Sequence, residues 1–319
     1  MRALITGATG FIGSHLCKKL LQRGYDVTCL LRERSSSQWI ESLKLTPVTG
    51  DCTQMGTLST ISNDFDYIFH LAGLTKACTR EDFFDANVKG TENILQVALR
   101  NNNLKRFIYL SSLSATGPSK NGTPVNEDVE PGPVSSYGES KLRGEKAVLG
   151  YRDKIPVTIL RPPAVYGPRD RDFLVFFRMI KKGFYPDWGK CYYSMLYVDD
   201  LIQGILLSSE KKNAQGEIYF LSGTEFYKGS EIAEAISAAL NVEVRKLRIP
   251  KLVMPLFAYI GERVNRKGII NRDKVRELKY SHWICDAQKA REEIGFQTKT
   301  PLKDGVQWTA DWYRMHRWM

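Results

Sequence analysis

Long apolar runs and clustered cysteines are both missing from this sequence. The longest apolar run, near residues 252–260, is interrupted by Pro255, whereas a helix that crosses a membrane needs about 20 apolar residues. The six cysteines are scattered, with no C-x-x-C pair and no metal-ligand spacing. Because the first apolar strand begins beside Met1, no room remains for a signal peptide. We therefore expect a cytoplasmic protein with reduced thiols, no membrane span and no metal.

Acidic residues are outnumbered, yet the charge pattern argues against a nucleic-acid partner. The 319 residues carry a formal net charge of +11, but basic and acidic side chains are interleaved along the chain. An anionic cofactor or substrate accounts for the excess equally well. With 43% hydrophobic and 25% charged residues, the composition is that of a globular protein with one large domain, or a large and a small one.

The opening residues carry the strongest local pattern. Residues 3–6 are typical of an apolar strand, and a helix is expected from Phe11 onward. Between them Gly7, Gly10 and Gly13 lie three residues apart. Such a turn needs one glycine for positive φ, one where a pyrophosphate approaches the backbone, and one for close packing of helix on strand. The helix N-terminus also attracts phosphates, so the pattern predicts dinucleotide binding rather than an ordinary turn.

Strands and helices then alternate with short connections. Strands are expected at residues 3–6, 26–31, 46–49, 67–72, 106–110, 157–160 and 218–221, and helices at 11–23, 58–62, 87–100, 136–149, 173–182, 199–209, 229–240, 252–264 and 306–316. This alternation predicts an α/β fold, a doubly wound (Rossmann) parallel sheet with a smaller, mostly helical C-terminal substrate domain. We place the dinucleotide-binding domain at residues 1–167 and the substrate domain at 168–319, with 195–222 returning to the sheet.

The end of the second expected strand bears on which dinucleotide binds. An acid there hydrogen-bonds the ribose 2′-hydroxyl of NAD, but this sequence has Leu31 followed by Arg32, Glu33, Arg34 and three serines. A guanidinium matches the oxygens of a 2′-phosphate bidentately. NADP is therefore the preferred cofactor; NAD, held through Glu33, and a merely solvated basic loop are the alternatives.

Two later strand ends fit the same site. Asp51 follows the strand at 46–49, where it can accept from the adenine amino group or cap a helix. The strand at 67–72 ends at Gly73, which we expect beside the pyrophosphate. His70 of that strand is expected to be a packed core histidine rather than a catalyst.

A tyrosine and a lysine on the helix expected at 136–149 form the second anchor. Tyr137 and Lys141 are four residues apart, so the phenol and the ammonium project from one face. A close ammonium favours phenolate and lowers the phenol pKa toward values useful for proton transfer. Ser112 follows the strand at 106–110, at the edge where such sheets bind ligands, and its hydroxyl can polarise a carbonyl. A surface Tyr–Lys pair is the alternative.

Eight motifs together resemble a known family. They are TGATGFIG (6–13), GD (50–51), HLAG (70–73), NVKGT (87–91), SSLSATG (111–117), YGESK (137–141), RPPAVYGP (161–168) and YVDD (197–200). Up to about residue 222 the chain resembles the extended short-chain dehydrogenases/reductases, the NAD(P)-dependent epimerase/dehydratase family. The resemblance implies a homodimer, with Tyr137 as proton donor or acceptor and Lys141 as its pKa-lowering, ribose-binding partner. It also implies Ser112 as the substrate-orienting hydroxyl, with Ser111 and Ser114 as rivals.

The resemblance and the patterns above give a set of expected contacts. For the cofactor they are Gly7, Thr9, Gly10, Phe11, Ile12, Gly13, Arg32, Asp51, Cys52, Leu71, Ala72, Gly73, Asn87, Tyr137, Lys141, Pro162 and Val165. For the substrate they are Ser114, Tyr166, Arg171 and Tyr193. Asn87 also fits a structural role, and Arg171 also fits a solvated surface position.

Departures from the family pattern bear on the substrate. Members that act on nucleotide sugars usually carry an arginine for the diphosphate, and the position that aligns with it here is Tyr193. A dehydratase would carry Asp-Glu where this chain has Leu113 and Ser114. The run SSLSATGP and Arg32 instead resemble the 3β-hydroxysteroid dehydrogenase and dihydroflavonol reductase branches, which act on alcohol–ketone pairs.

We therefore expect an NAD(P)-dependent oxidoreductase that interconverts a secondary alcohol and a ketone of a small-molecule substrate. A nucleotide-sugar epimerase that uses transient oxidation by tightly bound NAD(P) is one alternative. A non-catalytic dinucleotide sensor, which has no need of the Ser112, Tyr137 and Lys141 set, is another. The apolar segment at 249–260 is expected to form a helix over the substrate pocket, with insertion into a membrane interface as the alternative.

Overall fold

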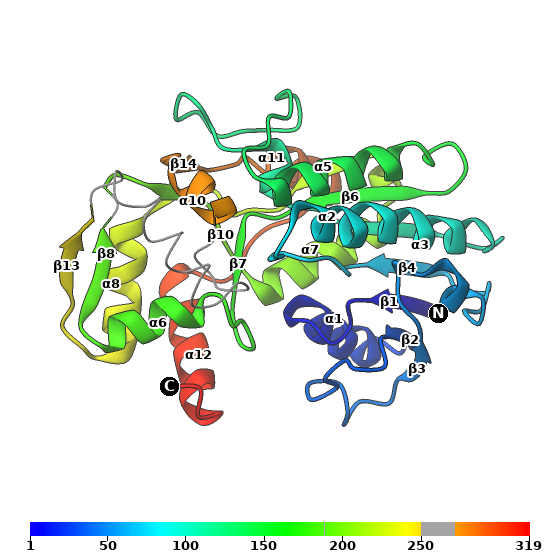
Figure 1. Ribbon diagram of the computed structural model, residues 1–319, viewed down its shortest axis with the longest axis horizontal. Coiled ribbons are helices and arrows are strands. Elements are labelled where there is room, and N and C mark those ends of the chain that lie inside the picture. Colours follow the sequence, from blue (N-terminus) through cyan, green and yellow to red (C-terminus); the bar gives the residue numbers. More distant parts are fainter. Residues whose placement is uncertain (188, 250–271) are drawn as a thin grey trace.

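The protein is described here by a computed structural model, which covers residues 1–187, 189–249 and 272–319. Its centre is a seven-stranded sheet in the order β3-β2-β1-β4-β5-β6-β11, and every neighbouring pair is parallel (Figure 1). The strands are β1 (Arg2–Thr6), β2 (Asp26–Leu31), β3 (Thr46–Thr49), β4 (Tyr67–His70), β5 (Arg106–Leu110), β6 (Val157–Arg161) and β11 (Ile218–Phe220). The expected doubly wound sheet is confirmed, and its strand order reverses between β1 and β4.

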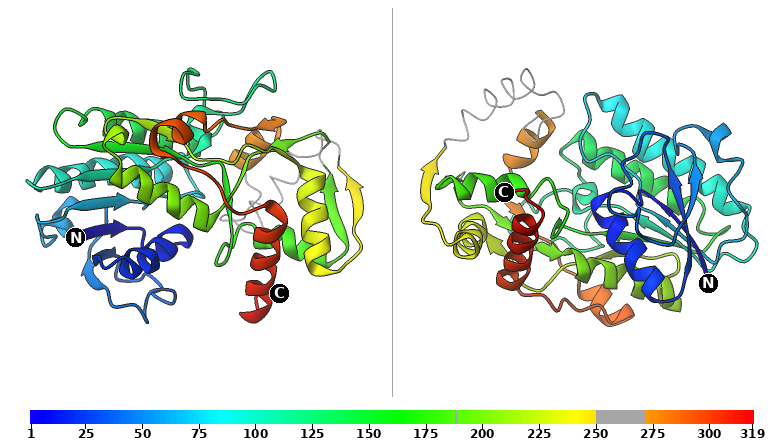
Figure 2. Two further views of the ribbon diagram at one scale, coloured as in Figure 1. Left: turned by 180° about the vertical axis from the view of Figure 1, so that it is seen from behind. Right: turned by 90° about the horizontal axis from the view of Figure 1, so that it is seen from below.

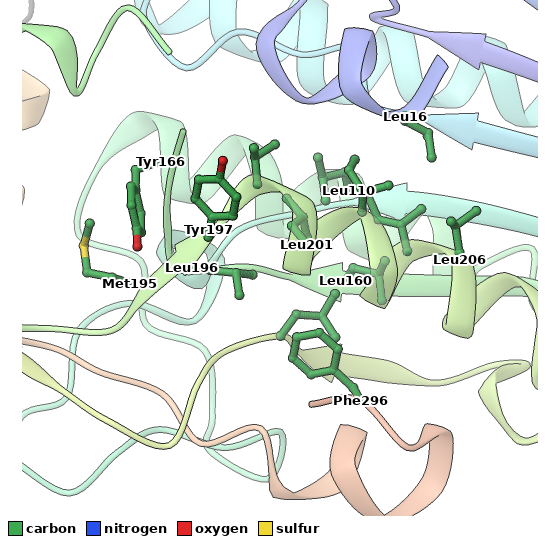
Figure 3. Close-up of a cluster of buried hydrophobic side chains, with 14 of the residues drawn as sticks. Leu16, Leu110, Leu160, Tyr166, Met195, Leu196, Tyr197, Leu201, Leu206 and Phe296 are labelled. Atoms are coloured by element: carbon green, nitrogen blue, oxygen red, sulfur yellow. The ribbon is translucent and has the colours of Figure 1, made fainter. Parts of the chain in front are cut away.

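Helices cover both faces of this sheet. They are α1 (Phe11–Gln22), α2 (Arg80–Phe84), η2 (Asp85–Lys89), α3 (Gly90–Leu99), α4 (Leu113–Thr116), α5 (Ser136–Leu149), α7 (Val198–Glu210) and α11 (Gln288–Ile294), with 3-10 turns η1 (Met55–Leu58) and η3 (Lys212–Ala214). Alternate residues of each strand face opposite layers. Ala3 and Ile5 pack in one apolar cluster with α1 and α7, whereas Leu4 packs in a second cluster with α3 and α5. Figure 3 shows part of the first cluster, where Leu110 and Leu160 meet Leu201 of α7.

Smaller elements lie beyond the carboxyl edge of the sheet, at the left of Figure 1 and again in both views of Figure 2. They are β7 (Ala164–Tyr166), α6 (Leu174–Lys181), β8 (Phe184–Asp187), β9 (Tyr192–Tyr193), β10 (Met195–Tyr197), β12 (Tyr227–Lys228), α8 (Gly229–Leu240), β13 (Arg245–Arg248), α10 (Arg272–Leu278), β14 (His282–Trp283) and α12 (Leu302–Met315). Their short strands pair as β10–β7, β12–β9–β14 and β13–β8. These pairings were not expected from the sequence, because two to four residues are too few to show a period.

The helix expected at 58–62 is instead the single turn η1, where the Ser59 hydroxyl bonds the Gly56 carbonyl at 3.1 Å and competes with a regular helix. The helix at 252–264 and the apolar segment from residue 250 to 260 lie outside the described residues. Within the described ranges, no helix has both the length and the apolar character to span a bilayer.

Candidate active site

The glycine turn forms a cradle at the start of α1. Gly7 has φ +73°, and a Cβ there would lie 2.8 Å from the Ala72 backbone nitrogen. A Cβ on Gly13 would lie 2.1 Å from the Gly7 carbonyl oxygen, so helix and strand are in close contact. Gly10 is exposed and gives α1 no side-chain cap, which leaves first-turn N–H groups for an anion. The half-buried Thr9 and the start of α1 at Phe11, Ile12 and Gly13 surround this opening. The turn therefore fits a dinucleotide pyrophosphate.

The neighbouring strands bring the other expected cofactor contacts to the same edge. Thr6 pairs with Leu30 of β2 and with His70 of β4, so the three strands end side by side. The expected contacts that follow them are Arg32 after β2, Asp51 and Cys52 after β3, and Leu71, Ala72 and Gly73 after β4. Arg32 is exposed, and Asp51 Oδ1 accepts the Thr53 N–H at 2.8 Å.

His70 is a packed core histidine, as predicted. Its ring is fully buried, with Nδ1 2.7 Å from the Thr6 hydroxyl and Nε2 3.0 Å from the Thr91 hydroxyl. Burial, assisted by the charge of Lys141, lowers its pKa to about 3. The Thr6 hydroxyl also accepts the Ala72 N–H at 3.2 Å. The histidine is therefore neutral and fixes the end of β4 against β1.

Helix α5 carries the expected catalytic pair. The Ser112 hydroxyl interacts with the Tyr137 phenol and lowers its pKa, and it accepts the Ser114 N–H at 3.1 Å as the cap of α4. The Lys141 ammonium donates to the Leu110 carbonyl at 2.6 Å and lies 4.3 Å from the centre of the Tyr109 ring. It also lies 3.8 Å from the place that a Cβ of Gly73 would occupy. The ammonium thus lies beside Gly73, at the carboxyl edge of the sheet.

The pKa of Tyr137 differs from the sequence expectation. Burial raises it to about 12, and the hydrogen bond from Ser112 acts in the opposite direction without offsetting burial. Burial likewise lowers the pKa of Lys141 to about 7, against the charge of Glu145. Lys141 is not among the groups that lower the phenol pKa, and its ammonium donates to the Leu110 carbonyl; the lowering by Lys141 that the sequence predicts therefore stays a prediction. Tyr137 is a protonated phenol at neutral pH.

The three candidate serines have separate surroundings. Ser111 is buried and donates its hydroxyl to Glu145, which also accepts from Arg161 Nη2 at 2.6 Å. Ser112 and Ser114 both line a cavity, and Ser114 Oγ lies 3.5 Å from Glu277 Oε1. Ser112 is the serine whose hydroxyl influences the pKa of the Tyr137 phenol.

Helix α10 holds the N-terminus of α5, which the sequence analysis missed. Asp273 accepts the N–H groups of Ser136 and Tyr137 at 2.8 and 2.9 Å. Glu277 accepts the hydroxyl of Ser135 at 2.9 Å. The spacing of Asp273 and Glu277 places both carboxylates on one helical face. No local pattern in the sequence indicates that this face contacts α5, which lies more than a hundred residues earlier in the chain.

Asn87 is a bridge between loop and helix. Its amide accepts the Leu74 N–H at 2.8 Å and donates to the Leu74 carbonyl at 3.0 Å and to the Ser140 hydroxyl at 2.8 Å. Ser140 in turn donates to the Tyr137 carbonyl at 2.7 Å. The buried Asn87 therefore ties the segment after Gly73 to the helix that carries the tyrosine.

A cavity of about 270 Å³ begins at Ser112 and Ser114. The other residues that line it are Leu113, Pro163, Ala164, Val165, Phe173, Phe176, Ile180, Tyr185, Pro186, Tyr193, Ser194, Met195, Gly229, Ile232, Ala233, Ile236, Lys274, Glu277, Leu278 and Trp283. Two expected contacts, Val165 and Tyr193, are among them. Pro162 lies just before this wall, and its carbonyl accepts the Leu113 N–H at 2.8 Å.

Tyr166 and Arg171 are not brought to this cavity. Tyr166 is 2% exposed and packs 5.7 Å from the Tyr197 ring in the core shown in Figure 3. Arg171 is exposed and lies over the Trp318 ring at 5.5 Å. Among the described residues, no group of His, Cys, Asp and Glu side chains gathers in a way that could hold a metal ion.

Comparison with known proteins agrees with this geometry. The sequence model of the NAD dependent epimerase/dehydratase family matches residues 3–222. A ceramide reductase from Caulobacter vibrioides is 29% identical over 99% of this chain and 95% of its own length. A putative dihydroflavonol 4-reductase from Synechocystis is 28% identical over 95% and 93%. The crystal structure of a UDP-glucuronic acid 4-epimerase from Bacillus cereus, in complex with UDP-glucuronic acid and NAD, superposes with a TM-score of 0.78 at 26% identity, covering 99% of this chain and 100% of that one.

Proposed function

The chain belongs to the NAD dependent epimerase/dehydratase family, and we propose that within it the protein is a reductase that converts a ketone to a secondary alcohol. One observation carries the proposal: Ser112, whose hydroxyl interacts with the Tyr137 phenol and lowers its pKa, also lines the cavity. The ammonium of Lys141 lies beside Gly73, which follows β4. A carbonyl oxygen set between the two hydroxyls has two donors.

The chain's own residues polarise the carbonyl and deliver the proton. A bound NAD(P)H supplies the hydride. Ser112 orients the carbonyl oxygen, and Tyr137 donates the phenolic proton to that oxygen as the alcohol forms. Because burial raises the pKa of Tyr137 to about 12, the phenol is protonated at neutral pH, which favours reduction over oxidation. Lys141 holds the ribose hydroxyls, and its positive charge stabilises the phenolate until solvent returns the proton.

The preferred cofactor is NADP(H). Arg32 is exposed directly after β2, beside the glycine cradle, and can meet a 2′-phosphate bidentately. Isothermal titration should give tighter binding of NADP⁺ than of NAD⁺. Arg32→Ala should lower affinity for NADP⁺ about 10-fold or more and leave NAD⁺ unchanged, since a charge-assisted hydrogen bond contributes about 1.5–3 kcal/mol. Arg23→Ala, which removes an ion pair to Glu210 at the other end of α1, is the control. A preference for NAD⁺ would contradict this assignment.

The proposal extends to organisation and location. Residues 1–167 act as the dinucleotide-binding domain, with 195–222 completing it, and 168–319 supply the substrate side. The enzyme works as a homodimer in the cytoplasm, a location supported by its six free thiols. Light scattering on the purified protein tests the dimer.

The reaction is tested by steady-state turnover of ketones with NADPH. Tyr137→Phe should lower kcat at least 100-fold while leaving affinity for NADP⁺ within about twofold, because the hydroxyl donates only to the reacting oxygen. Tyr151→Phe, on a surface tyrosine bonded to Gln96, is the matched control. Undiminished turnover in Tyr137→Phe would remove the phenol from the mechanism.

A nucleotide-sugar epimerase is the second candidate, favoured by the match over its full length to the Bacillus cereus epimerase. Such an enzyme retains its dinucleotide through purification and releases no oxidised cofactor. A thermal-shift panel with UDP-sugars and ketones separates the two. Stabilisation by UDP-sugars alone would favour the epimerase, and cofactor binding without turnover of either class would favour a sensor.

A further inference from the structure

The two helices in the cavity wall contribute only apolar side chains to it, and the polar residues of the remaining described lining beyond the serines at its start are Tyr185, Tyr193, Ser194, Lys274 and Glu277. Helix α6 contributes Phe176 and Ile180, which are four residues apart and so on one face, and Phe173, the residue just before the helix, lies three positions before Phe176. Across from it, α8 contributes Ile232, Ala233 and Ile236. The same two helices lie side by side at the left of Figure 1. No polar side chain comes from either helix face.

The charged groups at the cavity are already paired. Among the described lining residues these are Lys274 and Glu277, whose side chains are 2.9 Å apart. Glu277 accepts in addition from Ser135 at 2.9 Å. A nucleotide diphosphate placed here would lose its hydration and meet no unpaired cation along the described walls. The cavity therefore disfavours an anionic substrate.

We infer that the substrate is a ketone that carries an unbranched aliphatic chain, with the chain lying between α6 and α8. This inference rests on the proposed function, because it takes the carbonyl to lie at Ser112 and Tyr137. A cavity of about 150 Å³ accommodates benzene. At the same volume per carbon atom, the cavity of about 270 Å³ in this protein accommodates about ten or eleven carbons.

A chain suits these walls better than a hydroxylated ring system. Hydroxyl groups on the part of the substrate held by α6 and α8 would face apolar side chains from both helices, and burial of a hydroxyl without a partner is unfavourable. A methylene chain needs only apolar contact and adapts to walls of mixed shape. Ala233 and Ile236 set its length, since both are buried and lie on the cavity side of α8.

The test is a series of 2-alkanones from about four to about fourteen carbons, turned over with NADPH. Burial of each methylene should raise kcat/KM about three- to fourfold, up to about ten or eleven carbons, where the cavity is filled. Ala233→Leu adds about three carbons to the wall and should shorten the optimum by about three. Ile236→Ala removes about three carbons and should lengthen the optimum by the same amount. Ala238→Leu, on the exposed side of α8, should leave the profile unchanged.

Binding separates this inference from the proposed function. Isothermal titration of the same ketones into Tyr137→Phe protein loaded with NADP⁺ measures chain recognition without turnover. If no ketone is reduced but affinity rises with chain length, the reductase proposal fails and the chain inference stands. Ketones that are reduced with no dependence on chain length would overturn the inference, as would tighter binding of a rigid steroid ketone or a UDP-sugar than of any alkanone. Shifts of the optimal chain length in opposite directions in Ala233→Leu and Ile236→Ala support the inference. If only one of the two variants folds, the shift in that variant decides.

Discussion

The carboxylate of Asp273 accepts the backbone N–H of Tyr137 at 2.9 Å. The bond crosses 136 positions of sequence and joins α10, at the wall of the cavity, to the first turn of α5. A negative charge at a helix N-terminus is favourable because it satisfies unpaired donors and opposes the positive end of the helix dipole. The position of the phenol therefore depends on a helix that also encloses the substrate cavity.

Removing this contact should loosen the tyrosine. For Asp273→Ala we expect a loss of about 1 kcal/mol in the free energy of unfolding. A larger effect is expected on kcat than on cofactor affinity, because a misplaced phenol affects the transition state. Urea unfolding and steady-state kinetics measure the two. Arg276→Ala is the control, since it removes the 3.7 Å pair with Asp273 but leaves the contact with α5; equal losses in both variants would contradict a role for the Asp273 carboxylate at the helix.

Reduction and oxidation should respond differently to pH. Burial raises the pKa of Tyr137 to about 12, so the phenol remains a proton donor across the neutral range. Ketone reduction is expected to decline only as Lys141 loses its charge above about pH 7, because the phenol keeps its proton there, whereas oxidation of the alcohol, which needs phenolate, should rise about tenfold per pH unit. Initial rates in both directions, with cofactor and substrate saturating, test this. An oxidation rate that levels off near pH 7 would mean that the bound cofactor lowers the phenol pKa.

The buried ammonium of Lys141 is expected to lower the free energy of unfolding. Burial lowers its pKa to about 7, from an ordinary value of about 10.4. Above pH 10.4 the amine is neutral in both folded and unfolded chains. As pH falls toward 7 only the unfolded chain gains the proton, so stability declines over that range and is constant below it.

Lys141→Met should therefore raise the free energy of unfolding of the unliganded protein, by on the order of 2 kcal/mol at pH 7, while abolishing turnover. The gain should shrink at pH 9.5. Urea unfolding at the two pH values measures it. A gain that is the same at both would show that packing, rather than the buried charge, is responsible.

The buried pair of Glu145 and Arg161 should be a main support of α5. Their side chains are 1% and 3% exposed, and Arg161 donates to both carboxylate oxygens, at 2.9 and 2.6 Å. Glu145→Gln would leave a buried guanidinium without its counter-charge, at a cost of about 3–5 kcal/mol.

The matched control on the same helix is Glu139→Gln. Glu139 pairs with Arg80 at 2.7 Å on the surface, where such pairs contribute about 1 kcal/mol or less. Urea unfolding compares the two variants. Similar losses would mean that the buried pair contributes no more than a solvated one.

Much of the sheet could be predicted because its signals are local. The strands at Asp26–Leu31, Thr46–Thr49 and Arg106–Leu110 have the predicted bounds, since apolar runs between turn residues define them. A Cβ at Gly7 or Gly13 would clash with neighbouring backbone atoms, so only glycine fits at either position. Their spacing in the sequence is therefore enough to predict the cradle. The face shared by Tyr137 and Lys141 follows in the same way from the helical period.

Only the tertiary structure decided how these groups are used. The sequence by itself determined that a phenol and an ammonium share a helical face, but not that Lys141 would turn onto the Leu110 carbonyl. It also left three serines as candidates for the substrate-orienting hydroxyl. The surroundings of Ser111 and Ser112 differ: Ser111 meets the buried Glu145 carboxylate, and Ser112 lies near the Tyr137 phenol. Partners such as Asp273 and the walls of the cavity come from distant segments. Their contacts depend on how helices pack across the sheet edge, and periodicity within one segment carries no information about that packing.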